Sequence, residues 1–278
     1  MTTLVTGATG NTGRHVVAEL LRRGERVRAL TRDPAAAKLP SGVELATGTH
    51  TAPETLGPAL DGITRLHITV TAGLAEVGEE LVRRAVDAGV RRITVVWGGA
   101  VGPVEQAVAD SGVEWTRLEP QEFMSNTLTW VDSIRAEGVV REPYDFPSAL
   151  VHEADIGAVA AAALLEDGHA GQAYNLTGPE SLTLQERLAI LSKAIDRDIA
   201  FDRISHQQAI DRLLARGVSQ ADADYVIGWY AAPPTEAATV DDTVPRVLGR
   251  PALTFAQWAA EHADRFRSSA PAPVGTAR

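Results

Sequence analysis

The sequence of 278 residues contains no cysteine, so it has no disulfide framework, no thiolate metal site and no cysteine nucleophile. It also contains no apolar run near the roughly 18–20 residues that cross a bilayer, and its N-terminus lacks the basic and apolar regions of a signal peptide. We therefore expect a cytoplasmic protein without a membrane partner.

Lysine is almost absent, because only Lys38 and Lys193 occur among the 26 basic residues. The formal net charge is −10. A duplex-binding surface gains its affinity from clustered lysine and arginine side chains that meet phosphates, so this balance argues against nucleic acid as a partner. Hydrophobic residues make up 45% and charged residues 22% of the chain, which is typical of a globular protein with a packed core.

Short apolar runs alternate with segments of helical periodicity in the first part of the chain. This alternation predicts βαβ units and an α/β fold, a Rossmann-type doubly wound parallel sheet. Boundaries such as Arg23-Gly24 and Ala88-Gly89 are typical of helix ends. Strands are expected at 4–6, 27–30, 43–46, 66–70, 93–96, 113–118 and 174–176, and helices at 75–88, 104–111, 155–165, 184–195, 207–215, 220–230 and 255–266.

The pattern also predicts a domain organisation. Residues 1–178 are expected to form the Rossmann domain, with a loop-rich excursion over 120–150 toward a substrate site. Residues 179–267 are expected to form a smaller, mostly helical substrate-binding lobe, and the Ser-, Ala- and Pro-rich residues 268–278 a disordered tail.

A glycine-rich loop with the spacing G-x-x-G-x-x-G directly follows the first expected strand and opens a helix. Glycines allow the tight turn and let the backbone approach a diphosphate, while the amides and dipole of the helix N-terminus favour the phosphates. The loop therefore predicts a dinucleotide site. The expected cofactor-binding residues here are Gly7, Thr9, Gly10, Asn11, Thr12 and Gly13.

The choice of dinucleotide depends on residues about 20 positions further on, where a carboxylate holds a ribose 2′-hydroxyl and an arginine holds a 2′-phosphate. Here Thr31 occupies the expected carboxylate position and Arg32 follows it. This arrangement favours NADPH over NADH. Asp33 is the counter-argument, but its place before Pro34 is more typical of a loop or helix start.

These motifs resemble the atypical short-chain dehydrogenase/reductase family, specifically its NmrA-like branch. The resemblance covers residues 1–267 and rests on GATGNTG at 7–13, TRDP at 31–34, LEPQEFMSN at 118–126 and ADIG at 154–157. It implies that the glycine loop and Arg32 bind the cofactor and that residues 120–126 lie near the nicotinamide, which makes Pro120 an expected cofactor contact. Thr71 is a further expected contact, because it follows the fourth strand. The family includes quinone and carbonyl reductases, an angucyclinone ketoreductase, and redox-sensing regulators that bind NADP without turnover.

The sequence departs from the broader dehydrogenase pattern at the catalytic pair. An ordinary member uses Tyr-x-x-x-Lys, in which the phenol gives the proton and the ammonium lowers its pKa. Neither lysine is placed to replace that partner, since Lys38 follows the second expected strand and Lys193 lies late in a helix of the lobe. The residues at that spacing after the four tyrosines are Ser148, Gly178, Trp229 and Pro234.

Another group must then donate the proton that follows hydride transfer. The candidates are Gln121, Glu122, Ser125 and Asn126, for which ordinary loop hydrogen bonding is the alternative. A substrate with a phenol beside its ketone is a further hypothesis, because that phenol itself can protonate the product. This hypothesis predicts a polycyclic hydroxy-ketone or quinone of the aromatic polyketide type.

Several other polar residues have two interpretations. Thr69 and Thr71 are either ribose contacts or ordinary strand formers. His152, Glu153 and Asp155 form either an acid–base cluster or, as we favour, a helix cap. No pair of histidines has metal-ligand spacing, so we expect no metal.

Aromatic residues are few, at 5% of the chain, and some of them are candidates for contact with a flat substrate. The expected substrate-binding residues are Trp97, Phe123, Met124 and Trp229, with core packing as the alternative for the tryptophans, Trp130 included. The leading interpretation is an NADPH-dependent reductase of a bulky aromatic ketone or quinone. The alternatives are a non-catalytic NADP(H)-sensing regulator, whose lobe would bind a protein partner, and an isomerase or epimerase with tightly held cofactor.

Overall fold

The computed structural model describes residues 1–71, 73–96 and 101–267, and its chain forms two compact units. Unit 1 consists of Met1–Phe123, Val151–Pro179 and Asp241–Ala252. Unit 2 consists of Met124–Leu150, Glu180–Val240 and Leu253–Arg278. The chain therefore passes between the units several times. The expected disordered tail at 268–278 lies outside the described residues.

Unit 1 is built on a seven-stranded parallel sheet with the strand order β3-β2-β1-β4-β5-β6-β8. The order reverses at β1, so the carboxyl ends of β1 and β4 flank the switch point at which open α/β sheets bind their ligands. This confirms the expected Rossmann-type fold. The strands are β1 (Thr2–Val5), β2 (Arg26–Thr31), β3 (Glu44–Thr47), β4 (Arg65–Thr69), β5 (Arg92–Val96), β6 (Glu114–Pro120) and β8 (Gln172–Leu176).

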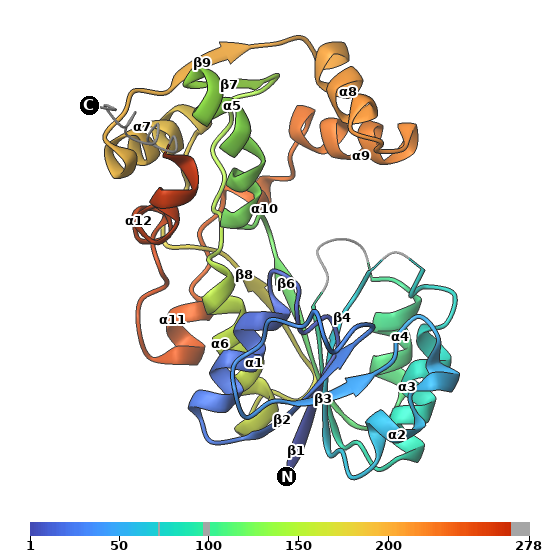
Figure 1. Cartoon of the computed structure of the whole chain (residues 1–278). Helices are drawn as coiled ribbons and strands as arrows, with labels where there is room; N and C mark the ends of the chain where they lie inside the picture. Colours follow the sequence, from blue (N-terminus) through green and yellow to red (C-terminus); the bar gives the residue numbers. More distant parts are fainter. Residues whose placement is uncertain (72, 97–100, 268–278) are drawn as a thin grey trace, which may run out of the picture. The chain divides into compact units, whose positions relative to one another are not determined.

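Helices cover both faces of this sheet (Figure 1). Successive strand residues point to opposite faces, so Leu4 and Val5 enter two separate hydrophobic cores. One face packs against α1 (Gly13–Arg22), α6 (Glu153–Leu165) and α11 (Thr243–Leu248). The other packs against α2 (Gly57–Leu60), α3 (Gly78–Asp87) and α4 (Pro103–Asp110), and the short helix η1 (Pro53–Thr55) precedes α2.

Helices α1 and α6 approach each other closely because α6 carries small residues. A Cβ atom on Gly157 would lie 2.6 Å from the backbone carbon of His15 in α1. The residues Ala158 to Leu164 of α6 are all buried, so this helix is apolar around its whole circumference. The close contact between α6 and His15 fixes the N-terminal turn of α1, which directly follows the glycine loop.

Unit 2 is mostly helical but contains a two-stranded parallel sheet that the sequence did not predict, formed by β7 (Val139–Glu142) and β9 (Ala200–Arg203). Its main core joins Trp130 and Met124 to the side chains of α7 and α12. The helices are η2 (Met124–Trp130), α5 (Val131–Glu137), α7 (Leu184–Ile195), α8 (His206–Ala215), α9 (Gln220–Ala231), α10 (Thr235–Ala238) and α12 (Phe255–Phe266).

The excursion expected at 120–150 is less irregular than predicted. η2, α5 and β7 occupy most of residues 124–142, and the stretches 121–123 and 143–150 lie outside helices and strands. Gly138 ends α5 with a φ of 67°. The sequence suggested a loop here because this glycine is followed by Pro143 and Pro147. The assignment of cofactor binding to one domain and substrate binding to the other stays a prediction.

None of the helices in the described part of the chain combines the length and the apolar character that a membrane crossing needs.

Candidate functional site

The glycine loop between β1 and α1 is a tight turn in which little more than backbone fits. Gly7 has a φ of 61°, and its carbonyl oxygen accepts a hydrogen bond from the Gly10 amide at 2.9 Å. A Cβ atom on Gly13 would lie 2.1 Å from that same oxygen, and one on Gly7 would lie 3.0 Å from the Cβ of Thr69. Glycine is therefore required at 13 by contact and at 7 by both contact and conformation.

The N-terminus of α1 fits an external anion. Thr12 stands at the N-cap, yet among the described residues its side chain makes no capping hydrogen bond to the helix. The amides of Arg14, His15 and Val16 donate to the carbonyl oxygens of Gly10 and Thr12 at 2.9–3.3 Å, so a diphosphate would be held by the positive end of the helix dipole and the exposed backbone of the loop. Thr9 and Asn11 are exposed on the same loop, so all six expected residues of the loop lie together. These residues fit a dinucleotide.

The end of β2 presents a cation rather than a carboxylate. Arg32 is exposed, whereas the Asp33 carboxylate accepts hydrogen bonds from the amides of Ala35 at 3.0 Å and Ala36 at 3.2 Å. The Thr31 hydroxyl also accepts a bond from the Asp33 amide at 3.2 Å. Asp33 therefore organises the turn, as its position before proline predicts, and Arg32 is the charged group presented at this strand end.

Two threonines follow β4 and have different partners. Thr69 packs its side chain against Gly7, and its amide donates to the Thr6 hydroxyl at 3.1 Å. Thr71 is exposed, and its hydroxyl lies 2.8 Å from Nε2 of His50. Thr69 thus packs against Gly7 of the glycine loop, while Thr71 contacts His50, a residue that the sequence did not single out.

A second residue that the sequence did not single out is Arg14, which follows the last glycine of the loop. Its Nε donates to the carbonyl oxygen of Gly10 at 3.0 Å, and its side chain is exposed. The position of Arg14 directly after the glycine loop could have indicated a positive charge beside the loop.

The segment expected near the nicotinamide begins at the carboxyl end of β6. Pro120 is buried and pairs with Leu176 of β8. The Gln121 side chain donates to Oδ1 of Asn175 at 2.5 Å, while Glu122 is only 4% exposed and its carbonyl oxygen accepts from the Val151 amide at 2.8 Å. Gln121 and Glu122 are thus fixed at the same sheet edge as the glycine loop.

The rest of that segment belongs partly to unit 2. Phe123 ends the first segment of unit 1 and forms an isolated bridge with Val151, whereas Met124, Ser125 and Asn126 open η2 in unit 2. Met124 is 1% exposed in the core of unit 2. Ser125 is half-buried and Asn126 exposed. The proton-donor candidates are therefore divided between the two units, and their roles stay predictions.

Of the polar residues at the start of α6, His152 caps the helix. His152 stands at the N-cap, and its Nδ1 accepts a hydrogen bond from the Ala154 amide at 3.0 Å. Asp155 is fully buried and pairs with Arg250 at 2.7 Å. The favoured interpretation of these residues, capping, is confirmed for His152. Across the described residues, no group of three or more histidine or acidic side chains is arranged as a metal site.

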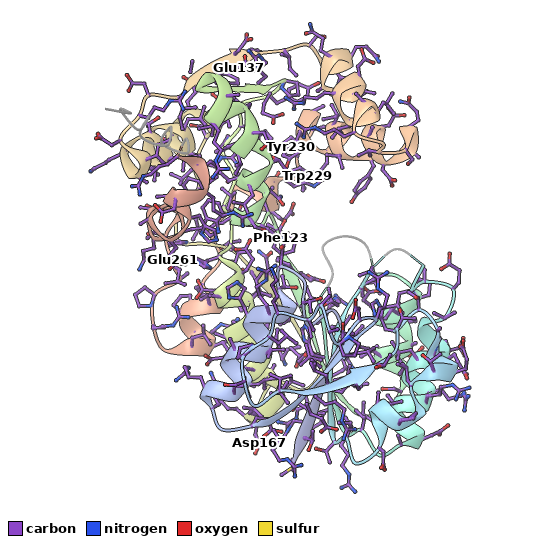
Figure 2. All side chains as sticks on the ribbon, viewed as in Figure 1. Phe123, Glu137, Asp167, Trp229, Tyr230 and Glu261 are labelled. Carbon is purple, nitrogen blue, oxygen red and sulfur yellow. The ribbon has the colours of Figure 1, made fainter. Side chains whose placement is uncertain are left out.

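Trp229 and Tyr230 lie next to each other in unit 2 (Figure 2). The ring of Trp229 lies edge-on to those of Phe146 and Tyr230, with centroid distances of 5.9 and 5.2 Å, and all three side chains are half-buried. Trp130 instead donates its Nε1 hydrogen to Glu142 at 2.9 Å within the core. Trp229 therefore has an accessible ring, Trp130 is a core residue, and Trp97 lies outside the described residues.

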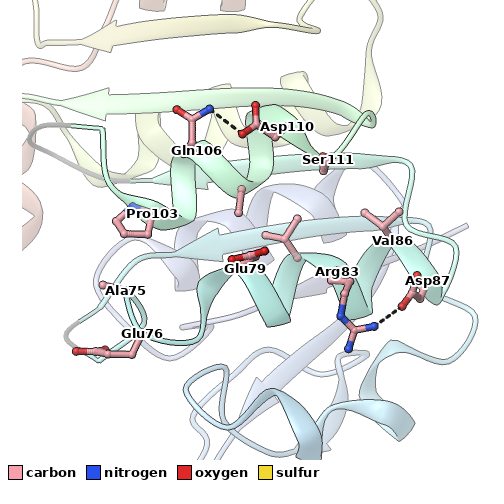
Figure 3. A pocket seen from close by; sticks show the side chains of 12 residues that line it. Ala75, Glu76, Glu79, Arg83, Val86, Asp87, Pro103, Gln106, Asp110 and Ser111 are labelled. Carbon is pink, nitrogen blue, oxygen red and sulfur yellow. Dashed lines mark hydrogen bonds and ion pairs between the residues drawn. The ribbon is translucent and has the colours of Figure 1, made fainter.

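A surface groove of unit 1 runs between α3 and α4 (Figure 3). Polar side chains such as Glu79, Arg83 and Asp110 line much of it. Among the described residues that are expected to bind cofactor or substrate, none lines this groove, so the groove is separate from their site.

The parallel sheet, its switch point and the glycine loop define a dinucleotide-binding protein of Rossmann type. Comparison with known proteins gives the family. The model of the NmrA-like family matches residues 1–102. The chain is 37% identical to a (4-alkanoyl-5-oxo-2,5-dihydrofuran-3-yl)methyl phosphate reductase of Streptomyces griseus subsp. griseus, over 95% of this chain and 98% of the relative. This chain belongs to the NmrA-like family.

Other relatives agree in class. An NAD(P)H azoreductase of Xenophilus azovorans is 36% identical over 95% of this chain and 98% of its own length. The crystal structure of an Escherichia coli NADPH-dependent quinone oxidoreductase complexed with NADPH has the same fold, with a TM-score of 0.78 and 24% identity over 93% of this chain and 99% of that one. The family and the class expected from the sequence, an NADPH-dependent oxidoreductase, are thus confirmed.

Proposed function

We propose that this protein reduces a carbonyl group of a bulky aromatic ketone or quinone with NADPH. The cofactor supplies the hydride when it is bound. The observation that carries the proposal is the glycine loop at the switch point of unit 1, where Gly7, Gly10 and Gly13 bring backbone without side chains to the N-terminus of α1. Residues 7–13 would hold the diphosphate there, and Arg32 would select the 2′-phosphate.

The division of roles at the end of β2 supports NADPH over NADH. A 2′-hydroxyl would need a carboxylate acceptor, but the Asp33 carboxylate is held in the turn by two backbone amides that donate to its Oδ1. A guanidinium such as that of Arg32 binds phosphate oxygens through two parallel hydrogen bonds. The guanidinium of Arg32 is therefore suited to bind the 2′-phosphate of NADPH.

The substrate class rests on the aromatic residues of unit 2. Phe146, Trp229 and Tyr230 present half-buried rings that prefer edge-to-face or offset contacts with another aromatic ring. The names of the Streptomyces and Xenophilus relatives describe reductases and mention no polyketide. An aromatic polyketide is thus a proposal from this chain's own residues, with Phe123 and Trp97 as further contacts.

The proton is proposed to come from the substrate. The chain has no Tyr-x-x-x-Lys pair, and the side-chain amide of Gln121, one hydrogen of which bonds to Asn175, is not an acid that can give up a proton. A phenol next to the reduced ketone can donate its proton to the developing alkoxide through an internal hydrogen bond. In this scheme the protein orients the substrate and Gln121, Ser125 or Asn126 binds the carbonyl oxygen or a water.

A matched pair of substrates tests this scheme. NADPH oxidation is followed with a polycyclic hydroxy-ketone and with the same ketone lacking the neighbouring phenol. We expect turnover of the first and a loss of at least about tenfold for the second, since general acid catalysis contributes on the order of 10²–10⁴ in rate. Equal rates would contradict substrate-assisted protonation.

The missing catalytic pair also favours a second candidate, a regulator that binds NADP(H) without turnover. The two functions differ in one measurement. A regulator would bind NADPH tightly and oxidise none of it in the presence of any ketone or quinone of a broad panel, whereas the reductase consumes NADPH and acceptor in equal amounts over many turnovers.

A further inference from the structure

The hydrogen bond between His50 and Thr71 joins two segments that are far apart on the sheet. His50 lies three residues after the end of β3, and Thr71 lies two residues after the end of β4. The strand order β3-β2-β1-β4 places β2 and β1 between them. The contact therefore spans the carboxyl ends of the two strands that carry Arg32 and the glycine loop.

Independent contacts show that these segments pack together in unit 1. The Gly48 amide donates to the carbonyl oxygen of Thr31 at 3.0 Å, which holds the start of the His50 segment beside the end of β2. On the other side, a Cβ atom on Gly73 would lie 3.9 Å from the methyl group of Thr51. The position of His50 is thus set by both neighbouring strand ends.

His50 is also electrically coupled to Arg32. Burial first, and the positive charge of Arg32 second, lower the pKa of the His50 imidazole. Among the described residues, Arg32 is the charged group that acts on the His50 imidazole, while Thr71, its hydrogen-bond partner, carries a hydroxyl and no charge. A second cation beside Arg32 is unfavourable in the free protein, and a dianion placed between the two would remove that repulsion.

We propose that His50 is a second ligand for the 2′-phosphate of NADPH, which it holds together with Arg32 while Thr71 orients its imidazole ring. This inference rests on the proposed function, because it assumes that the glycine loop binds the cofactor. It adds a specificity-determining residue that neither the motifs nor the loop spacing indicated. A ligand phosphate would raise the pKa of His50, so binding takes up a proton near neutral pH.

The sign of the pH dependence follows from that uptake. NADPH affinity should rise as the pH falls from about 8 toward 6, because a protonated imidazole binds the dianion better. The gain should fade below about pH 6, where the phosphate itself takes up a proton. NADH affinity should lack this component over the same range, because NADH has no 2′-phosphate.

The test is titration calorimetry of the full chain with NADPH, NADH, 2′,5′-ADP and 5′-AMP, at pH 7 in two buffers of different ionisation enthalpy. We expect proton uptake with NADPH and 2′,5′-ADP that is absent with NADH and 5′-AMP. His50→Gln should weaken NADPH binding about tenfold or more and leave NADH binding within about twofold. Thr71→Val should reduce the proton uptake and weaken NADPH by a smaller factor.

His169→Gln is the matched control. The pKa of His169 is also lowered, mainly by burial, but this residue precedes β8 and so lies at the amino-terminal edge of the same sheet. Its replacement should leave the ratio of NADPH to NADH affinity unchanged.

The outcomes separate the two proposals. Failure of the wild-type chain to bind either coenzyme would overturn the proposed function, and this inference with it. Normal binding with an unchanged coenzyme ratio in His50→Gln, or an equal loss for NADPH and NADH, would overturn the role of His50 alone. Should His50→Gln not fold, the ligand-specific proton uptake of the wild-type chain and of Thr71→Val still decides the question.

Discussion

Gly13 is the residue of the glycine loop at which a side chain meets the most backbone. In Gly13→Ala the new Cβ would lie 2.1 Å from the oxygen and 2.7 Å from the carbonyl carbon of Gly7, neither of which can rotate away. We expect NADPH affinity to fall at least about tenfold and stability to fall by about 1–3 kcal/mol, as overpacking typically costs. Fluorescence titration and urea unfolding measure both.

Gly10→Ala is a milder variant for comparison. Its Cβ would lie 3.1 Å from the same Gly7 oxygen, a contact that a small shift relieves. Its effects should be smaller than those of Gly13→Ala. An alanine at 13 that leaves binding and stability intact would show that the loop does not have the tight form described above.

Arg32 is expected to set coenzyme choice. Replacing it with serine removes a charge-assisted hydrogen bond worth about 1.5–3 kcal/mol. NADPH binding should therefore weaken roughly 10- to 100-fold while NADH binding stays the same. Arg26→Ser serves as the control, because Arg26 is an exposed arginine at the amino end of the same strand. Dissociation constants of both coenzymes are the measurement, and a retained NADPH preference in Arg32→Ser would contradict the assignment.

His67 makes the fold sensitive to acid. It is fully buried in β4, where its Nδ1 lies 2.8 Å from the Thr94 hydroxyl, and burial lowers its pKa from 6.5 to about 3. Between about pH 6.5 and 3 the unfolded chain takes up a proton that the folded chain does not, so stability is lost as the pH falls through that range. At pH 5 the loss is about 2 kcal/mol.

His67→Gln should remove this component while keeping a polar partner for Thr94. Urea unfolding at pH 7 and pH 5 gives the comparison. The wild-type chain should lose about 2 kcal/mol more than the variant between these two pH values. An identical loss in both chains would mean that His67 is not buried in its neutral form.

At the scale of elements, the contact between α1 and α6 fixes the helix that opens with the glycine loop. A Cβ on Gly157 would meet the backbone of His15 at 2.6 Å, so Gly157→Ala must push the helices apart. We expect a loss of about 1–3 kcal/mol in stability. Gly228→Ala in α9, where a Cβ meets nothing within 4 Å, should instead be neutral or stabilising. Thermal unfolding compares them, and an equal effect of both substitutions would contradict the close contact.

Most elements were predictable because their patterns are local. Strands β1, β4 and β5 are short runs of consecutive buried residues, as expected of a parallel sheet covered on both faces. Gly24 and Gly89, each with positive φ, follow the ends of α1 and α3 as their sequence context predicts. The pair β7 and β9 was not predictable. Each strand has only four residues, three of the four residues of β9 are exposed, and the 57 residues 143–199 separate the two strands in sequence. Two short, mostly exposed strands of this kind show little alternation of polar and apolar residues in the sequence.

The site was predictable to the extent that it depends on contiguous motifs. The loop at 7–13 and the residues after β2 are adjacent in sequence, and their spacing has a physical meaning. His50 and Arg14 were missed for different reasons. His50 acquires its neighbours only when β3 and β4 come to the same sheet edge, whereas Arg14 was adjacent to the motif but has no role in its spacing.

At the scale of the whole molecule, the proposed function divides the work between the units, with cofactor bound by unit 1 and substrate contacted by unit 2. Trp229→Leu should then raise the KM for an aromatic substrate about tenfold and leave NADPH affinity unchanged, because a lost aromatic contact costs about 1 kcal/mol beyond its buried area. Tyr225→Ala is the control, since Tyr225 lies on the same helix and is 66% exposed. A changed NADPH affinity with an unchanged KM in Trp229→Leu would contradict this division.

The central claim is that NADPH bound at the glycine loop gives its hydride to a carbonyl carbon. The most direct measurement uses NADPH deuterated at C4 of the nicotinamide, an aromatic ketone from the acceptor panel, and mass spectrometry of the alcohol formed. The account predicts one deuterium per product molecule on the former carbonyl carbon, with many turnovers per chain. Bound NADPH that stays fully deuterated across the whole panel, with no labelled alcohol, would contradict it.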